Sequence, residues 1–395
     1  MIKYNCAPTA EFLKKFHDVI VVVARKKMGL YISTIPEPIA SRYRAFFDFS
    51  MISNILLCQP HNLLSHIHNI YSNFPELADR FWPAYLLSGC PIPENIESHH
   101  IKSKKGKIDL QAIVMSTDKF ISKKNTNQLT LIPALLKDLR AATTASQKRK
   151  ALTRISKAAQ GDLTLTDNEL KSFPKWINEF STVFDYPHLS QNYGHNIVNE
   201  WKIDICLYCN DEGIQSRGEE DQFKTDLDHF YPKSKFPFLA ISLYNLVPAG
   251  GFCNQKFKKD SDMLDSMHPF EDGASEIPLF HINYPLGGKL LENNYSVDLW
   301  PQNHKIDRNL EMFKIAHYYS SNREVRSLTA RTFRSVELIL GLGKKNISAD
   351  AISEITKSML EQIIDISLPP HTSRKKKFIV DSVNQFAGKK IFDYL

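Results

Sequence analysis

A short segment of the chain, DLDHFYPKSKFPFLAISLYNLVPAGGFCNQK at positions 226–256, concentrates the polar side chains that are best suited to chemistry. Asp228 stands next to His229, and Asn254 follows 26 residues after Asp228. Carboxylate and amide oxygens are the ligands that a hard divalent cation prefers, and histidine suits a general base because its unperturbed pKa of about 6.5 lies near working pH. Asn245 lies between them, where its amide can fasten a loop backbone and hold His229. The competing interpretation is structural: these side chains cap a helix or satisfy buried backbone groups.

Four short motifs follow one another in this part of the chain: CLYC at 206–209, DLDHFYPKS at 226–234, YNL at 244–246 and CNQK at 253–256. In this order and spacing they resemble the HNH endonuclease family, in its cysteine-containing branch. The resemblance covers about a third of the chain, from Cys206 to about Lys259 and more loosely the HPF at 268–270 and the EMFKIAHYYSSNREVR that follows. It implies a ββα-metal finger, in which a hairpin carries the Asp-His pair and a helix carries the last Asn.

The resemblance also implies a role for each polar residue. His229 is then the general base that activates a water molecule. Asp228 and Asn254 are the ligands of one divalent ion, Mg²⁺ or Mn²⁺, and Asn245 orients the loop that carries His229. The implied reaction is hydrolysis of a phosphodiester bond, in which the ion stabilises the developing charge and the leaving 3′ oxygen.

A structural zinc site is part of the same resemblance, but the chain departs from it. The branch uses four thiolates, and Cys206, Cys209 and Cys253 match three of them, whereas Gly250 stands where the fourth is expected. Zinc in structural sites is almost always four-coordinate. Three possibilities therefore remain open: His268 completes the site, water completes it, or the site has lost its metal.

Basic residues are concentrated between positions 101 and 158, where fourteen Lys and Arg stand against three Asp. Such density suits salt-dependent contacts to phosphates, although a solvated helix face is the ordinary alternative. The resemblance adds Lys256, on a helix expected to follow the phosphate backbone, and Lys233 as further nucleic-acid contacts. A last basic cluster, SRKKKF at 373–378, is expected to lie in a solvated loop between helices. The predicted partner is DNA, with RNA still open.

Periodicity and turn residues predict a mainly α protein with a small α+β insert, the HNH ββα-metal finger, flanked by helical regions. The predicted divisions are a helical region with the basic stretch at 1–195, the HNH nuclease domain at 196–275, a pair of short strands at 276–305 and a helical C-terminal region at 306–395. The short strands are expected in FHINYPLGGKLLENNYSVDLW, because alternation is interrupted there by GG and NN turns. A helix is expected over 347–366.

Composition restricts the class of protein. A hydrophobic share of 43% and a charged share of 24% over 395 residues are typical of a soluble globular chain. The absence of a long apolar run and of a signal-peptide pattern predicts a cytoplasmic protein with no membrane partner. Six dispersed cysteines do not form a secreted disulfide framework, and Cys6, Cys58 and Cys90 are expected to be packing residues. Oligomeric state has no sequence signal.

Three functional hypotheses follow. The first is a metal-dependent HNH endonuclease that cuts DNA, a hypothesis that rests on the ordered DH…N…CN motifs and the basic region at 101–158. Finger nucleases with helical arms resemble the HNH components of bacterial antiphage systems such as Septu, in which the nuclease pairs with an ABC-type ATPase, so this setting and partner are expected. The chain has no G-x-x-x-x-G-K-S/T motif of its own, so control by ATP requires a partner. The second is a stand-alone nuclease that restricts modified DNA. The third is a non-catalytic subunit that binds nucleic acid or a partner through an HNH-like finger.

Overall fold

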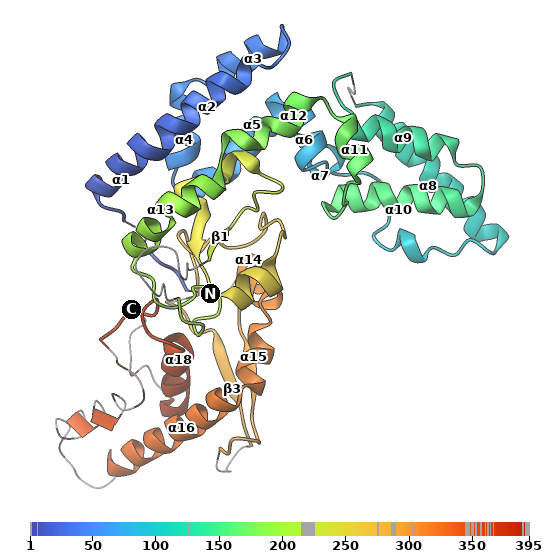
Figure 1. Ribbon diagram of the computed structural model, residues 1–395. Coiled ribbons are helices and arrows are strands. Elements are labelled where there is room, and N and C mark those ends of the chain that lie inside the picture. The colour runs from blue at the N-terminus through green and yellow to red at the C-terminus, as the bar shows by residue number, and fades with distance from the viewer. Residues whose placement is uncertain are drawn as a thin grey trace. The chain divides into compact units, whose positions relative to one another are not determined.

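The fold comes from a computed structural model (Figure 1). It describes the chain except for residues 1, 6, 125–126, 215–225, 275, 286–289, 302, 344–347, 349–350, 352–353, 356–357, 360, 362, 364, 366, 389–390 and 392–395. Cys6 and much of the helix predicted over 347–366 therefore lie outside the described residues.

The described chain is mainly helical and carries two small antiparallel sheets, as the sequence predicts. It forms two compact units. The first unit comprises Met1–Phe16, Pro187–Phe230 and Tyr244–Leu395, and the second comprises His17–Tyr186 and Tyr231–Leu243. The predicted finger segment, 196–275, belongs to the first unit except for its insert at Tyr231–Leu243.

The second unit is built from helices alone among its described residues. They are η1 His17–Val21, α2 Val22–Ile32, α3 Ile39–Phe46, α4 Phe49–Leu57, α5 Pro60–Asn73, α6 Pro75–Phe81, α7 Ala84–Leu87, η2 Ile96–Ser98, α8 Lys104–Ser122, α9 Leu131–Ala141, α10 Ala145–Gln160, α11 Asp167–Ser172, α12 Lys175–Glu179, η3 Phe180–Val183 and η4 Pro237–Leu239. An aromatic core holds the first half of this unit: Tyr43 and Phe74 lie 4.3 Å apart between ring centroids, and Phe47 stacks on Phe74 at 5.3 Å. Burial of several such rings stabilises the unit through apolar area and ring geometry.

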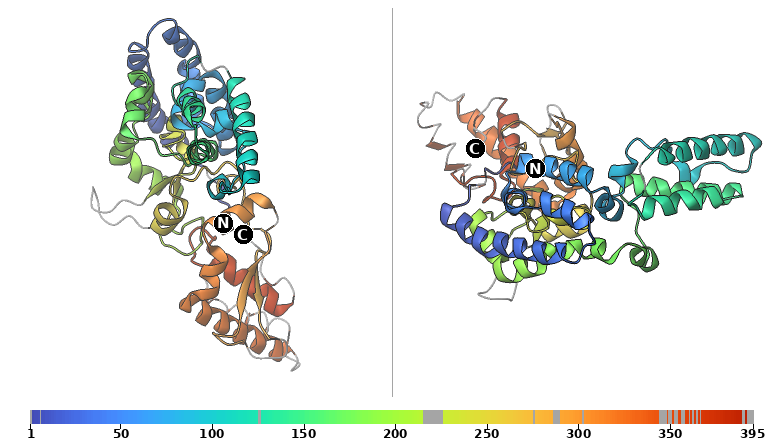
Figure 2. Two further views of the ribbon diagram at one scale, coloured as in Figure 1. Left: turned by 90° about the vertical axis from the view of Figure 1, so that its right-hand side faces the viewer. Right: turned by 90° about the horizontal axis from the view of Figure 1, so that it is seen from above.

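Helices α8, α9 and α10 pack on one another and contain the predicted basic stretch (Figures 1 and 2). The side chain of Thr144 caps the start of α10 in a reciprocal capping box with Gln147, and Gly161 ends the helix with a left-handed φ of 77°. Asp79, which is fully buried, accepts from the backbone N–H groups of residues 130, 131 and 132 at 2.6–2.9 Å. These bonds satisfy donors at the start of α9 that have no partner within the helix.

The insert Tyr231–Leu243 packs within the second unit through apolar rings and backbone bonds. Phe236 lies 5.2 Å from the ring of Trp82, and the buried hydroxyl of Ser242 donates to the carbonyl of Ile55 at 2.8 Å. The hydroxyl of Tyr71 donates to the carbonyl of Lys235. The thirteen residues of the insert therefore serve the helical core rather than the polar site.

The first unit holds both sheets and the remaining helices. Its elements are α1 Ala10–Phe16, α13 Tyr186–Trp201, β1 Leu227–His229, η5 Leu243–Asn245, β2 Leu246–Pro248, η6 Phe252–Lys258, β3 Phe280–Asn283, β4 Ser296–Leu299, α14 His304–Met312, α15 Ile315–Ser321, α16 Arg323–Gly343 and α18 Lys376–Ala387, where α13 and η5 each begin one residue inside the second unit. Strands β3 and β4 confirm the two short strands that turns and alternation predict, and they pair with Phe280 opposite Leu299.

The cluster SRKKKF does not form a solvated loop, and that prediction was wrong. Lys375, Lys376 and Lys377 are buried, and α18 begins inside the cluster at Lys376. The Nζ of Lys377 pairs with Asp381 at 2.8 Å, and that carboxylate also accepts from the backbone N–H of Phe280 at 2.9 Å. The cluster is buried because its charges are paired and α18 packs against α16 and β3. Among the described residues, none of the helices is both long and apolar enough to cross a membrane.

Candidate functional site

Strands β1 and β2 bring the predicted polar residues together. They pair antiparallel, with Asp228 opposite Val247 and His229 opposite Leu246. The indole N–H of Trp201, on α13, donates to the carbonyl of Leu246 at 3.3 Å and supports this ribbon from one side. Helix η6 follows β2 after a short turn, so the paired strands and this helix come in the order β1, β2, η6, with the short helices η4 and η5 in the connection between the strands. This is the order that the HNH resemblance implies.

Asp228 is held in a buried polar network that the sequence did not reveal. Its Oδ1 pairs with the Nζ of Lys258 at 2.9 Å, and its Oδ2 accepts from the hydroxyl of Tyr208 at 2.5 Å. Lys258 also donates to the carbonyl of His229 at 2.6 Å. Burial, assisted by the charge of Asp228, raises the pKa of Tyr208 well above its usual range, so this phenol remains a donor. The carboxylate therefore has a cation on one oxygen and a hydroxyl on the other.

Asn254, the second predicted ligand of the divalent ion, hydrogen-bonds the carboxylate of Asp226. Its amide Nδ2 donates to Oδ2 of Asp226 at 3.4 Å, and the amide of Gln255 donates to the same oxygen at 2.6 Å. Asp226 immediately precedes β1, and its carbonyl accepts from the N–H of Ala249 just beyond β2. Sequence reasoning missed Asp226, although the alternation of DLD places it on the same side of the strand as Asp228.

His229 and Asn245 lie at the two ends of the connection between β1 and β2. His229 ends β1 and is 8% exposed, so only a small part of its side chain meets solvent. Asn245 is fully buried at the end of η5, and its carbonyl accepts from the N–H of Phe230 at 2.9 Å. The backbone of the residue after His229 is therefore tied to the backbone of Asn245.

Helix η6 has π-helical geometry, and this explains the burial of Lys258. A π-helix bonds residues five apart, so Cys253 and Lys258 lie on one face, and both are buried. Lys256, the predicted nucleic-acid contact, is exposed, as are the rings of Phe252 and Phe257. The segment KFKK at 256–259 gave no signal in the sequence that Lys258 is a buried partner of Asp228.

The three cysteines form a cluster that suits a metal ion. The sulfur atoms of Cys206, Cys209 and Cys253 all lie within 4.8 Å of one another, and two of the three residues are buried. The other two thiols donate to Cys209 and hold its pKa well below the usual range, whereas burial raises the pKa of Cys206. A soft, buried donor set of this kind fits zinc, which structural sites bind through thiolates.

The turn that carries Cys206 and Cys209 is anchored by the C-terminal part of the chain. Asn210, which is buried with a left-handed φ of 55°, donates its amide to the carbonyl of Pro370 at 2.7 Å and accepts from the N–H of Lys377 at 3.0 Å. Lys375 pairs with Asp211 at 2.5 Å. The buried lysines of the basic cluster therefore brace the cysteine turn.

His268 does not join the cysteine cluster. Its ring lies 4.2 Å from the ring of Phe230 between centroids, and its Nδ1 accepts from the N–H of Phe270 at 3.2 Å. Burial lowers the pKa of His268 to about 3, so the ring is neutral at physiological pH. The structure thus places this histidine in an aromatic core, apart from the three sulfur atoms.

The predicted basic surface divides into structural arginines and exposed lysines. Arg140 pairs with Asp118 at 2.6 Å, Arg154 pairs with Glu169, and Arg149 donates to the carbonyl of His99 at 3.0 Å. The exposed lysines of this region are Lys102, Lys104, Lys105, Lys107, Lys119, Lys123, Lys124, Lys137, Lys150 and Lys157. Lys233, the other predicted contact, instead lies over the ring of Tyr186 at 4.3 Å, and burial lowers its pKa.

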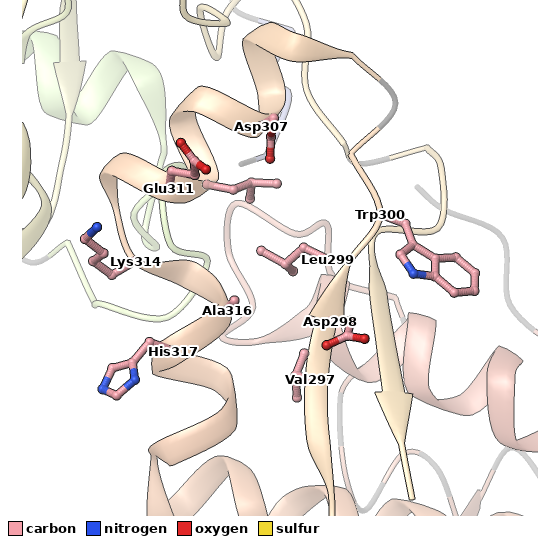
Figure 3. A pocket seen from close by; sticks show the side chains of 10 residues that line it. Val297, Asp298, Leu299, Trp300, Asp307, Glu311, Lys314, Ala316 and His317 are labelled. Carbon is pink, nitrogen blue, oxygen red and sulfur yellow. The ribbon is translucent and has the colours of Figure 1, made fainter.

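A separate hollow of about 690 Å³ lies between β4 and the helices α14 and α15 (Figure 3). Asp298 on β4, Glu311 on α14 and His317 on α15 are among the residues around it. None of the predicted site residues lines this hollow. It is therefore distinct from the polar site on β1 and η6.

The chain is similar to the Septu protein PtuB of Bacillus thuringiensis. The two are 28% identical over 146 residues, which is 36% of this chain and 52% of PtuB. The chain thus matches about half the length of that relative. No protein-family model matches the chain, and no solved structure matches it.

Proposed function

We propose that this protein is a metal-dependent HNH endonuclease that hydrolyses phosphodiester bonds of DNA. One observation carries the proposal: β1 and η6 carry Asp228, His229 and Asn254, and Asn245 immediately precedes β2, the strand that pairs with β1. Helix capping or hydrogen bonding to buried backbone groups gives no reason for all four polar residues to lie at this strand pair and the helix that follows it. The cysteine cluster beneath the helix start supports the same proposal, because it braces the element that carries Asn254.

His229 is the proposed general base. It takes a proton from the attacking water, and the buried backbone around Asn245 fixes the loop on its C-terminal side. Lys258 and Tyr208 fix the neighbouring Asp228, so the backbone of β1 has little freedom at the reacting position. Pre-organisation of this kind lowers the cost of reaching the reactive geometry.

Oxygen atoms of Asp228, Asn254 and the additional candidate Asp226 are the donors that suit a hard divalent ion such as Mg²⁺ or Mn²⁺. Asp226 and Asn254 are only partly buried, whereas Asp228 is almost fully buried. When bound, such an ion supplies stabilisation of the charge that develops on the phosphate and the leaving oxygen. Asp226 and Asn254 are thus the more accessible donors.

Replacement of His229 tests the proposed chemistry. His229→Ala should abolish cleavage of plasmid DNA in the presence of Mg²⁺ or Mn²⁺ while DNA binding in a filter or polarisation assay is retained. The matched control is His195→Ala, because His195 is an exposed histidine of the same unit. Undiminished cleavage by His229→Ala would refute the base assignment. Binding without nicks in the unmodified protein would instead favour the non-catalytic subunit.

Antiphage defence is the proposed setting. The similarity to the Septu protein PtuB supports it, and the helical second unit offers surface for a partner such as an ABC-type ATPase. Co-expression with the product of a neighbouring ATPase gene should yield a complex on size-exclusion chromatography and protect cells from phage, and His229→Ala should remove protection without removing the complex. Full protection by the chain alone, or a neighbouring methyltransferase gene, would favour the stand-alone restriction nuclease.

A further inference from the structure

Glu212 is fixed beside the cysteine turn by its own backbone. Its N–H donates to the sulfur of Cys209 at 3.4 Å, and its carbonyl accepts from the N–H of Cys206 at 2.9 Å. The residue therefore belongs to the turn that presents two of the three thiols. The only freedom that its carboxylate retains is in the side-chain torsions.

The carboxylate of Glu212 fills the space above Gly250. A Cβ atom added to Gly250 would lie 2.0 Å from Oε2 of Glu212 and 2.2 Å from its Cδ, which is closer than non-bonded atoms approach. Both carboxylate oxygens also lie 3.3 Å from the backbone N of Phe252, which donates to them. An acidic oxygen therefore occupies the place where a side chain of residue 250 would lie. The HNH resemblance expects the fourth thiolate at that position.

We propose that Glu212 is the fourth ligand of a zinc ion bound by Cys206, Cys209 and Cys253. Carboxylate oxygen is a regular zinc ligand at about 2.0–2.2 Å, and structural zinc takes four ligands. The exchange of a thiolate for a carboxylate keeps the number of anionic ligands. Gly250 is part of the same arrangement, because any side chain at that position would displace the carboxylate.

The glutamate has to rotate its side chain to bind. The three sulfur atoms all lie within 4.8 Å of one another, and the carboxylate oxygens of Glu212 are not part of this group. Ligation therefore requires rotation about the side-chain torsions of Glu212. The bonds from Phe252 N are long, at 3.3 Å, and are weak competitors for the carboxylate. His268, the other candidate, is held in its aromatic core by a backbone hydrogen bond.

Metal binding by four variants of the full-length protein tests this inference without an activity assay. Glu212→Ala should release zinc to a chelator at least about tenfold more readily than the unmodified protein, since loss of supporting groups alone costs 10- to 100-fold. Glu212→Gln keeps an acceptor for Phe252 but is a poor ligand, so it should also lose zinc. The double variant Glu212→Ala with Gly250→Cys should regain tight binding. Glu311→Ala, at an exposed acid of the same unit, is the matched control.

Cobalt substitution reports the ligand set directly. The absorption of the cobalt-loaded protein should show three thiolates in the unmodified chain and four in the double variant, with tetrahedral bands in both. Recovery of binding in the double variant also shows that a loss in Glu212→Ala is not a failure to fold. Zinc affinity and cobalt spectra unchanged by Glu212→Ala and Glu212→Gln would overturn the inference, as would a purified protein that binds no zinc. Loss of zinc in Glu212→Ala but not in Glu212→Gln would assign Glu212 to helix capping, which also refutes it.

Discussion

The buried pair of Lys258 and Asp228 makes the sharpest prediction for stability. Both side chains are at most 2% exposed, and their charged atoms lie 2.9 Å apart. The change Lys258→Met leaves the carboxylate of Asp228 buried without its cation, with the hydroxyl of Tyr208 as a remaining donor. Breaking one side of a buried ion pair costs about 3–5 kcal/mol, because the remaining charge has lost its compensation.

Hydrogen exchange of peptides that contain β1 and β2 measures this cost locally. A loss of about 3–5 kcal/mol corresponds to an opening equilibrium that is about 10²-fold to several thousand-fold larger, so exchange should accelerate by that factor when opening limits it through a pre-equilibrium. Lys256→Met is the matched control, because Lys256 is an exposed lysine of the same helix. Its effect on exchange should be within about twofold, since surface substitutions usually change stability by less than about 0.5 kcal/mol.

A double-mutant cycle separates the pair from the individual side chains. Asp228→Asn combined with Lys258→Met removes both charges, so the double variant should be more stable than Lys258→Met alone. The coupling free energy should be at least about 1.5 kcal/mol. Equal exchange in Lys258→Met and Lys256→Met, or a double variant less stable than either single one, would refute the assignment of a compensated buried pair.

Three further predictions concern the supporting structure. Asp381→Asn should destabilise the attachment of β3 to α18 by about 3 kcal/mol, because it leaves Lys377 buried without its carboxylate. Hydrogen exchange of the amides of residues 279–283 should become faster, and unchanged protection of these amides would contradict the prediction. His268→Phe should reduce the pH dependence of the free energy of unfolding. In the folded protein the pKa of His268 is about 3, below the ordinary 6.5, so between these pH values the unfolded chain binds more protons than the folded one. The stability of the unmodified protein should therefore fall from pH 6.5 towards 3, by at most about 5 kcal/mol, which denaturation at several pH values can measure. An equal change of stability with pH in the unmodified protein and in His268→Phe would contradict the assignment of this pH dependence to His268. Gly161→Ala should lower stability by about 1 kcal/mol in urea unfolding, because φ is +77° and the new Cβ would lie 3.3 Å from the indole nitrogen of Trp82; no loss would contradict the strain.

The sequence predicted those features that depend on local pattern. The helices of the basic stretch and the two strands around the GG and NN turns follow from periodicity and turn residues, and the structure confirms them. The four polar residues of the proposed active site were also identified in advance, because their motifs are short and ordered. What these residues do remains a prediction, as do Mg²⁺ or Mn²⁺, DNA and a partner ATPase.

Features that depend on contacts between residues distant in sequence could not be predicted from local sequence patterns. Lys258 became a partner of Asp228 because η6 is π-helical, and nothing in KFKK distinguishes its middle lysine. The buried lysines of the C-terminal cluster were misjudged because their partners, Asp211 and Asp381, are known only once the chain has folded. Charge clusters are usually solvated, so this prediction followed the common case and was wrong here.

The anchoring of Asn210 has a consequence for synthesis of the protein. Its side chain is satisfied by Pro370 and Lys377, which leave the ribosome more than 150 residues later. The residues of the second unit, 17–186 and 231–243, are all made before that point. A growing chain therefore finishes its helical unit while the cysteine turn still lacks its brace. The cysteine turn gains this brace only after residues 370–377 have been made, so a chain that stops before them lacks it.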